Sequence, residues 1–166
     1  MTTLFKIQLC TVFLICMLVS QPVQASCYTP GEAAAEQAIR LHSELMVIGL
    51  NCRHLDEGDT RDSYQTYRDF TRRHAEILRI YENSLINFFT REGQTDPAGH
   101  LNAMRTEMAN NLAELAVKIR PDVFCHKYMP RLHKAARMTQ SDVRTWSTTY
   151  FPSSPPSREY CLESSR

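Results

Sequence analysis

The chain has 166 residues, of which 43% are hydrophobic and 22% are charged, and its formal net charge is +1. This length suffices for a single domain that buries about two-thirds of the surface its unfolded chain exposes. A net charge close to zero argues against nucleic acid as the main partner, because nucleic-acid-binding domains carry a clear excess of bases.

Residues 1–25 have the pattern of an export signal. Lys6 supplies a positive charge, an apolar run extends from Leu9 to Val19, and the small-residue rule for cleavage is met at Ala25. The run is much shorter than the roughly 20 residues that span a bilayer. We therefore expect cleavage near Ala25 and a periplasmic or secreted mature chain without a membrane span.

A lipoprotein anchored through Cys27 is the alternative to this interpretation. Gln24 stands where a lipobox has Leu, so we favour the cleaved signal. The signal removes one Lys and no acid, which leaves equal numbers of bases and acids. It also removes Cys10 and Cys16. An even number of cysteines in an exported chain of this size indicates two disulfides, and those that remain are Cys27, Cys52, Cys125 and Cys161.

The stretch 26–52 predicts an amphipathic helix. Thr29 and Glu32 have the spacing of a capping box, and Pro30 stands at the first helical position. Gly49 lies inside the pattern, where close approach of another helix would explain it. Apolar or small residues recur at spacings of three and four, namely Ala35, Ala38, Ile39, Leu41, Leu45, Met46, Ile48, Gly49 and Cys52.

The end of this helix resembles a group of small exported bacterial helical proteins without an assigned activity. Their first mature helix ends in a Leu-Met-Val-x-x-Leu-x-Cys pattern, and here the matching residues are Leu45, Met46, Val47, Leu50 and Cys52. Phe124-Cys125 is a second landmark of the resemblance. The resemblance implies a helical fold and an exported location, and it assigns no catalytic residues to this chain.

Two further long helices follow an acidic turn. The second begins at about Arg61, is capped by Asp59 or Thr60, and ends near Gly93. Its apolar side contains Tyr64, Tyr67, Phe70, His74, Ile77, Leu78, Tyr81, Leu85, Phe88 and Phe89. The third begins at Asp96-Pro97 and is stopped by Pro121, with Leu101, Met104, Met108, Leu112, Leu115 and Ile119 on its apolar side.

After Pro121 the helical pattern becomes fragmented. We expect short helices over 122–128 and 130–138, and a third piece that Ser141 caps. An irregular segment rich in Pro and Ser begins at Phe151. The predicted organisation is thus a signal over 1–25, a helical domain over 26–150 and a C-terminal tail over 151–166 that Cys161 tethers.

We predict an all-α fold, an antiparallel bundle of three long helices plus a broken fourth segment, stapled by two disulfides. Cys27 and Cys52 stand at opposite ends of the first helix, roughly 35 Å apart at 1.5 Å per residue, so they cannot pair. The third helix brings Cys125 to Cys52, and the fourth segment returns Cys161 to Cys27. The predicted pairs are Cys52–Cys125 and Cys27–Cys161.

The histidines suggest a metal site, but their spacing does not support one. No HExxH motif and no Glu-x-x-His pair occurs. We place His42 at the border of the polar face and His74 in the core with a hydrogen bond. Pro130 interrupts the register between His126 and His133. Covalent haem attachment needs Cys-x-x-Cys-His, which is missing.

Two weaker ligand hypotheses also arise. Non-covalent haem ligation could draw on Met46, Met104 or Met108, although methionines at helical spacing are usually core residues. An acidic turn could hold calcium, but it lacks the pattern of an EF-hand loop and is better explained as a helix N-terminus. Its residues are Asp56, Glu57, Asp59 and Asp62.

Charge is unevenly distributed along the chain. Acids dominate over 26–63, and bases dominate over 118–144, where Phe124, Tyr128 and Trp146 lie among or beside them. We favour contact between these two segments within the fold over a docking surface. If the basic stretch binds a partner, an acidic protein or an anionic envelope surface suits it better than nucleic acid.

No enzyme motif is present, and we assign no catalytic, cofactor-binding or metal-binding residues. We favour an exported, non-enzymatic helical module that acts by contact with another envelope or extracellular protein. The alternatives are a binder of a small ligand, metal or haem within the bundle, and an enzyme of unknown class.

Overall fold

The computed structural model describes residues 27–55 and 62–161, and within these ranges the chain is all-α and has no strand. The predicted signal and the acidic turn residues Asp56, Glu57 and Asp59 lie outside the described residues. The elements are α2 (Pro30–Asn51), the 3-10 turn η2 (Arg53–Leu55), α3 (Ser63–Arg73), α4 (Ala75–Arg91), α5 (Pro97–Lys118), α6 (Pro121–Ala136) and α7 (Gln140–Thr148).

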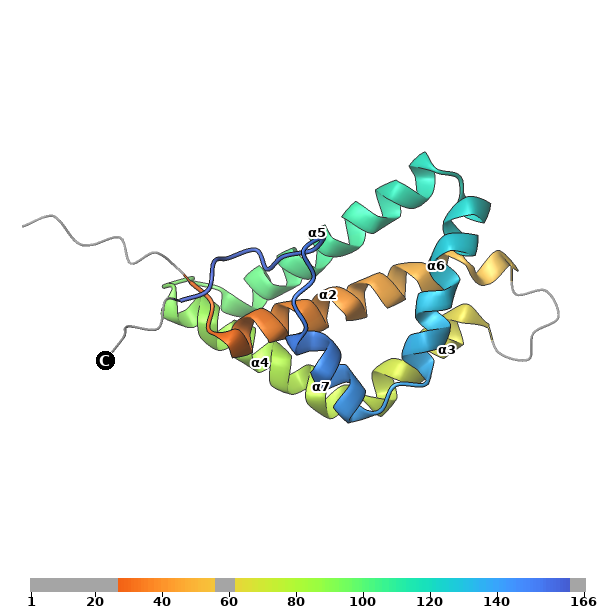
Figure 1. The fold of residues 1–166 in the computed structure, drawn as a ribbon. Helices are drawn as coiled ribbons and strands as arrows, with labels where there is room; N and C mark the ends of the chain where they lie inside the picture. Colours follow the sequence, from red (N-terminus) through yellow and green to blue (C-terminus); the bar gives the residue numbers. More distant parts are fainter. Residues whose placement is uncertain (1–26, 56–61, 162–166) are drawn as a thin grey trace, which may run out of the picture.

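Helix α2 runs through the middle of the molecule, and α3 to α7 each pack against it (Figure 1). Its residues from Glu32 to Ile39 are all buried. Such an element needs small and apolar side chains around its whole circumference, and the alanines in its first half provide them. The other helices are therefore organised around a buried central rod.

The core has two clusters along this rod. The larger lies toward the end of α2 and joins it to α3, α6 and α7, with Leu45, Ile48, Phe70, Phe124 and Leu132 almost completely buried. The smaller lies toward the start of α2 and joins it to α4 and α5, and it contains Tyr28, Ala35, Ile39, Leu85, Phe88, Phe89 and Leu101.

Local signals in the sequence set several helix ends. Both hydrogen bonds of the capping box between Thr29 and Glu32 are present, which confirms the predicted start of α2. Asp96 caps α5, with Pro97 in its first turn. Gly93 has a φ of +76°, the left-handed conformation that glycine adopts without steric cost after a helix.

The predicted second helix differs from the structure in two ways. The helix is divided at His74, which has φ −106° and ψ 12°, into α3 and α4. The apolar stripe continues across the division, so its spacing did not reveal the break. Asp62 caps α3 by accepting from the Gln65 amide, in place of the predicted Asp59 or Thr60.

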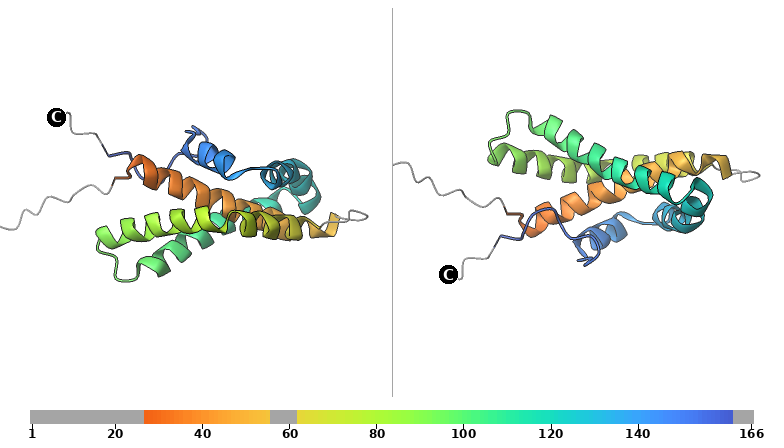
Figure 2. Two further views of the ribbon diagram at one scale, coloured as in Figure 1. Left: turned by 90° about the horizontal axis from the view of Figure 1, so that it is seen from below. Right: turned by 90° about the horizontal axis from the view of Figure 1, so that it is seen from above.

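The segment after Pro121 is also organised differently from the prediction. α6 is a single helix with Pro130 inside it, and α7 begins at a capping box of Thr139 and Asp142, so the predicted cap at Ser141 was wrong. Phe124 and Cys125 before Pro130, and Leu132 and Ala135 after it, are buried. Burial of both halves offsets the roughly 3 kcal/mol that an internal proline costs. Instead of descending along α2, α6 crosses its end (Figures 1 and 2).

Both predicted disulfides are present. Cys52 and Cys125 are joined with a Cα–Cα distance of 5.5 Å, and Cys27 and Cys161 with one of 4.8 Å. Because Cys27 Sγ is used in this bond, it is not free to carry a lipid, which counts against the lipoprotein alternative. Two disulfides are consistent with an oxidising extracellular or periplasmic location.

Gly49 lies at a close contact between α2 and α3. A Cβ added there would stand 3.1 Å from the Ser63 carbonyl oxygen and 3.1 Å from Tyr67 Cβ. Close helix approach is therefore the reason for a glycine here, as the sequence suggested. Over residues 27–55 and 62–161, no helix combines the length and the apolar character needed to cross a membrane.

Candidate functional site

A concavity lies between α2, α6, α7 and the segment that follows α7. Its deeper part has a volume of about 250 Å³, and a more open part of about 380 Å³ adjoins it. Lys134, Met138 and Trp146 line both parts, so we treat them as one feature, called the groove. The deeper part is also lined by Gln37, Arg40, Leu41, Glu44, Arg131, Ala135, Phe151, Ser153 and Ser154, and the open part by Arg137, Asp142, Thr145 and Thr149.

One wall of the groove belongs to residues 151–161, called the strap. The ring of Phe151 lies 5.3 Å from that of Trp146, centroid to centroid. Before the strap, Gln37 Nε2 donates to the carbonyl oxygens of Trp146, at 3.0 Å, and Thr149, at 2.6 Å. The buried Gln37 amide thus fixes the point at which the chain leaves α7 and turns back over α2.

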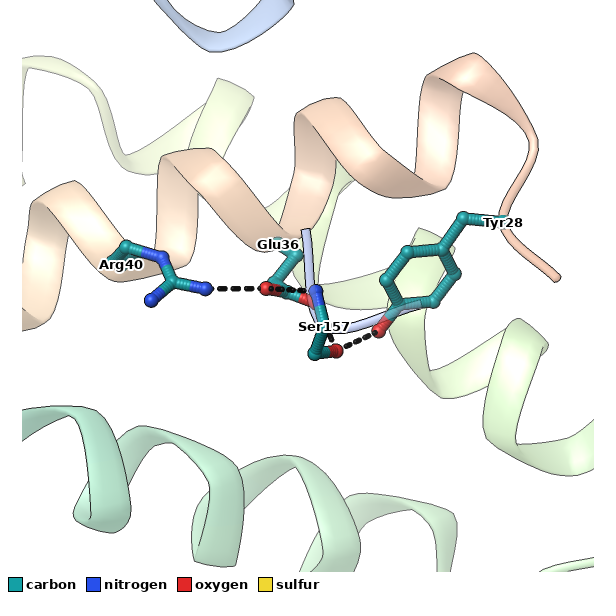
Figure 3. Close-up of polar contacts among 4 residues, drawn as sticks. All are labelled: Tyr28, Glu36, Arg40 and Ser157. Atoms are coloured by element: carbon teal, nitrogen blue, oxygen red, sulfur yellow. Dashed lines mark hydrogen bonds and ion pairs between the residues drawn. The ribbon is translucent and has the colours of Figure 1, made fainter. Parts of the chain in front are cut away.

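A buried carboxylate holds the middle of the strap (Figure 3). Glu36 is only 1% exposed, and its oxygens accept from the Ser157 amide at 3.0 and 3.2 Å and from Ser157 Oγ at 2.5 Å. Arg40 Nη2 donates to the same carboxylate at 2.6 Å. A charged group this deeply buried needs such partners, so Glu36 ties the strap to α2.

The far end of the strap pairs with the residues before α2. The Tyr28 amide donates to the Glu159 carbonyl at 2.8 Å, and the Cys161 amide donates to the Tyr28 carbonyl at 2.9 Å. The Tyr28 hydroxyl lies 3.5 Å from Ser157 Oγ. Burial, opposed by this contact, raises the pKa of Tyr28 to about 12, so the phenol stays neutral at physiological pH.

The charges of the groove are unequally neutralised. Arg131 pairs with Glu44 at 2.7 Å, and Arg40 is held by Glu36. Burial raises the pKa of Glu44, while Arg131 and Arg40 oppose that shift. Lys134 and Arg137 are exposed and form no ion pair with a described residue. The groove therefore combines half-buried aromatic rings with a positive rim.

The most connected histidine lies outside the groove. His42 Nε2 is 3.0 Å from Thr71 Oγ1 and 3.2 Å from the Tyr67 hydroxyl, and Arg105 donates to Nδ1 at 3.3 Å. Because Arg105 always donates, the neutral ring carries its proton on Nε2. Arg105 also pairs with Glu82 at 2.9 Å. This cluster links α2, α3, α4 and α5.

The structure corrects the prediction for His42. Its side chain is buried instead of bordering the polar face. Burial, aided by the charge of Arg105, lowers its pKa to about 4. A general base acting near neutral pH needs a pKa closer to 7 and access to a substrate, so we interpret the cluster as a structural one.

His74 also differs in part from its prediction. It is buried in the core as expected, with its ring 4.6 Å from that of Phe70. Neither ring nitrogen, however, has a hydrogen-bond partner among the described residues. Burial lowers its pKa, and the nearby backbone of Met138 opposes the shift without completing a hydrogen bond. Protonation of His74 is therefore disfavoured in the folded chain.

The structure does not bring the other candidate ligands together. His54, His100, His126 and His133 are exposed, and within residues 27–55 and 62–161 no three His, Cys, Asp or Glu side chains could together hold a metal ion. Met46, Met104 and Met108 are half-buried against the core clusters. Between the acidic and basic segments, Arg131–Glu44 is an ion pair of the predicted kind, while much of the basic stretch faces solvent.

Sequence reasoning missed the residues that build the groove and its wall. Glu36 lies between the apolar positions of the first predicted helix, where a polar residue predicts an exposed side chain, and Phe151 and Ser157 lie in the segment that was predicted to be an irregular tail. The available signal was Cys161, because a disulfide at the end of a tail requires that tail to lie along the domain.

Comparison of the chain with protein-family models, with curated proteins and with solved structures finds no match. The resemblance noted for the end of α2 thus assigns no family, and the function has to be argued from the groove itself.

Proposed function

We propose that this chain is a non-enzymatic binding module that acts in an oxidising compartment, periplasmic or extracellular, by contact with another protein. The observation that carries the proposal is the groove, where exposed bases surround half-buried aromatic rings. Aromatic and arginine side chains are enriched at protein interaction surfaces, and the groove contains Trp146, Phe151, Arg131 and Arg137. We also interpret α2, the pair α3 and α4, and α5 as the three long members of the predicted antiparallel bundle.

Two features of the scaffold support this proposal over an enzymatic function. The side chains that line the groove include no histidine and no cysteine. The histidine with the most polar contacts, His42, is directed into a cluster elsewhere, and its low pKa suits a neutral structural group. A cross-linked scaffold with a fixed wall suits recognition, since a preorganised surface loses less entropy on binding.

The test is site-specific photo-cross-linking in cells of the protein's own host. A photoreactive amino acid at Lys134 should yield a defined cross-linked protein, whereas one at Lys118, at the remote end of α5, should not. The captured protein, identified by mass spectrometry and purified, should then bind the unlabelled chain. Equal products from both positions, or no product at Lys134, would contradict the proposal.

A small-ligand binder is the second candidate, and the depth of the groove favours it. A volume of about 250 Å³ suits a molecule somewhat smaller than the drug-sized ligands that fill pockets of roughly 300 Å³ and more. Mass spectrometry of chain purified from its host under native conditions decides between the two. A small molecule present in equal amount to the protein would support this candidate and weaken the first.

A further inference from the structure

The rim of the groove has a surplus of positive charge that the fold does not use. Lys134 and Arg137 lie one turn apart near the end of α6, and neither forms an ion pair with a described residue. The nearby acid, Asp142, accepts from the Thr139 amide at 2.8 Å and from Thr139 Oγ1 at 2.8 Å. These bonds hold the Asp142 carboxylate at the start of α7, and neither base forms an ion pair with it, so the two bases leave a net positive charge at the rim for an external anion.

The depth of the groove is apolar. Leu41 and Ala135 are buried at its base, while Met138, Trp146 and Phe151 are half-buried around it. The deeper part, at about 250 Å³, has room for one large apolar side chain, and the open part continues from it past Lys134. An extended chain could lie along the open part while one of its side chains enters the deeper part.

We infer that the groove binds an acidic peptide segment of a partner protein, with one apolar side chain in the deeper part and carboxylates facing Lys134 and Arg137. This inference rests on the proposed function and names the chemistry of its partner. Charge complementarity favours an acidic segment: Lys134 and Arg137 outnumber Asp142, the acid that lines the open part of the groove, and desolvation by the aromatic rings strengthens a charge contact beside them.

The experiment uses the oxidised chain and its own fluorescence, because Trp146 is the single tryptophan of the sequence. The probe is a synthetic nonapeptide of Asp and Glu with one central Phe. Three matched probes replace the acids with Lys, replace the Phe with Ala, or reduce the ligand to phenylpropionate. Saturable change in Trp146 emission, checked by calorimetry, reports binding.

The acidic peptide with Phe should bind, and the other probes should bind at least about tenfold more weakly. Lys134→Glu should weaken binding about tenfold, because it removes an attraction and introduces a repulsion. Lys118→Glu makes the same change in net charge at a remote site and should leave the affinity unchanged. Added salt should weaken binding to the original chain more than to the Lys134→Glu variant.

Other outcomes overturn the inference in distinguishable ways. Equal loss in both charge-reversed variants would show a general charge effect, and equal binding of the Ala peptide would show that the deeper part is unused. Phenylpropionate as tight as the peptide would assign the groove to a small anion. If no peptide binds while Lys134 still cross-links to a partner in cells, the inference fails and the proposed function stands.

Discussion

The two disulfides close the molecule at opposite ends of α2, in different surroundings. Cys52 and Cys125 are 0% exposed and lie inside the larger core cluster, beside Phe124. Cys27 and Cys161 are half-buried, and the strap between α7 and Cys161 is held mainly by polar contacts to Glu36 and Tyr28. One cross-link reinforces packing that already exists, whereas the other substitutes for packing that a segment rich in Pro and Ser cannot provide.

The largest expected effect comes from removing the buried disulfide. Replacing Cys52 and Cys125 with Ala frees a loop with a sequence separation of 73. The entropy of that loop in the unfolded chain is worth about 4 kcal/mol, and the lost sulfur contacts in the core add to it. Urea unfolding followed by circular dichroism measures the change.

The matched comparison is the double Ala variant of Cys27 and Cys161. Loop length alone would make its effect the larger, since the separation is 134. We expect a loss of about 2 kcal/mol or less, because the freed strap detaches locally while the helices stay folded, so only part of the loop entropy is regained. A loss greater than that of the buried pair would show that the strap unfolds together with the helices.

Lowering the pH should destabilise the fold through His42, which contacts Tyr67 and Thr71 of α3. The pKa of His42 falls from 6.5 when unfolded to about 4 when folded, so the folded chain binds fewer protons between these values. The contribution of neutral His42 to the free energy of unfolding is fully present above pH 6.5 and is lost as the pH falls toward 4. Because one pKa unit corresponds to about 1.36 kcal/mol, the loss should be about 3 kcal/mol. His74 acts in the same direction.

Denaturant unfolding between pH 7 and pH 4 measures this dependence. A His42→Gln variant provides the control, because an amide keeps a donor and an acceptor without titrating, and its slope against pH should be shallower. An unchanged slope would show that protonation of His42 is not the cause.

The Glu36 anchor should matter most for the strap. Glu36→Ala leaves the Ser157 amide and Arg40 without their shared acceptor, which should cost about 2 kcal/mol, felt mainly as detachment of the strap. Limited proteolysis should then cut within residues 151–161 many times faster. Glu114→Ala, which removes an exposed ion pair with Lys118, should change neither stability nor cleavage, and equal cleavage in both variants would contradict the anchoring role.

The smallest and most local effects are expected from substituting two glycines, one near each end of α2. Gly49→Ala places a Cβ 3.1 Å from atoms of α3, and the resulting strain should exceed the roughly 1 kcal/mol gained in helix propensity, for a net loss of about 1 kcal/mol. Gly31→Ala, at the start of α2, meets only Thr29 Oγ1 at 3.9 Å and should be neutral or slightly stabilising. Thermal unfolding of both variants checks this, and a stabilising Gly49→Ala would show that α3 can move away.

Sequence reasoning predicted the features that depend on short-range chemistry. The caps at Thr29 and Asp96 follow from side chains that bond amides three residues away, and the disulfide pairs follow from the length of α2 as a rigid spacer. The continuity of α6 through Pro130 depends on tertiary burial that outweighs a local preference, so the local pattern predicted the opposite. The division at His74 lies on an unbroken apolar stripe and left no signal.

The groove could not be predicted for a further reason. It is formed where α2, α6, α7 and the strap meet, and its lining residues are separated by more than a hundred positions from Gln37 to Ser154. No single stretch contains its pattern. In the sequence, nothing distinguishes Trp146, Phe151 and Lys134 from ordinary surface or tail residues. They come together because the contacts of Gln37 and Glu36 fix the path of the chain after α7.

The bond between Cys27 and Cys161 joins points that are far apart along the chain yet have Cα atoms only 4.8 Å apart. A pulling force applied through positions 27 and 161 would pass along this covalent bond and bypass the helices. The domain between them would carry no tension, so stretching by way of these points would leave it intact until the sulfurs separate. The same closure holds the first and last described residues together at one pole of the domain.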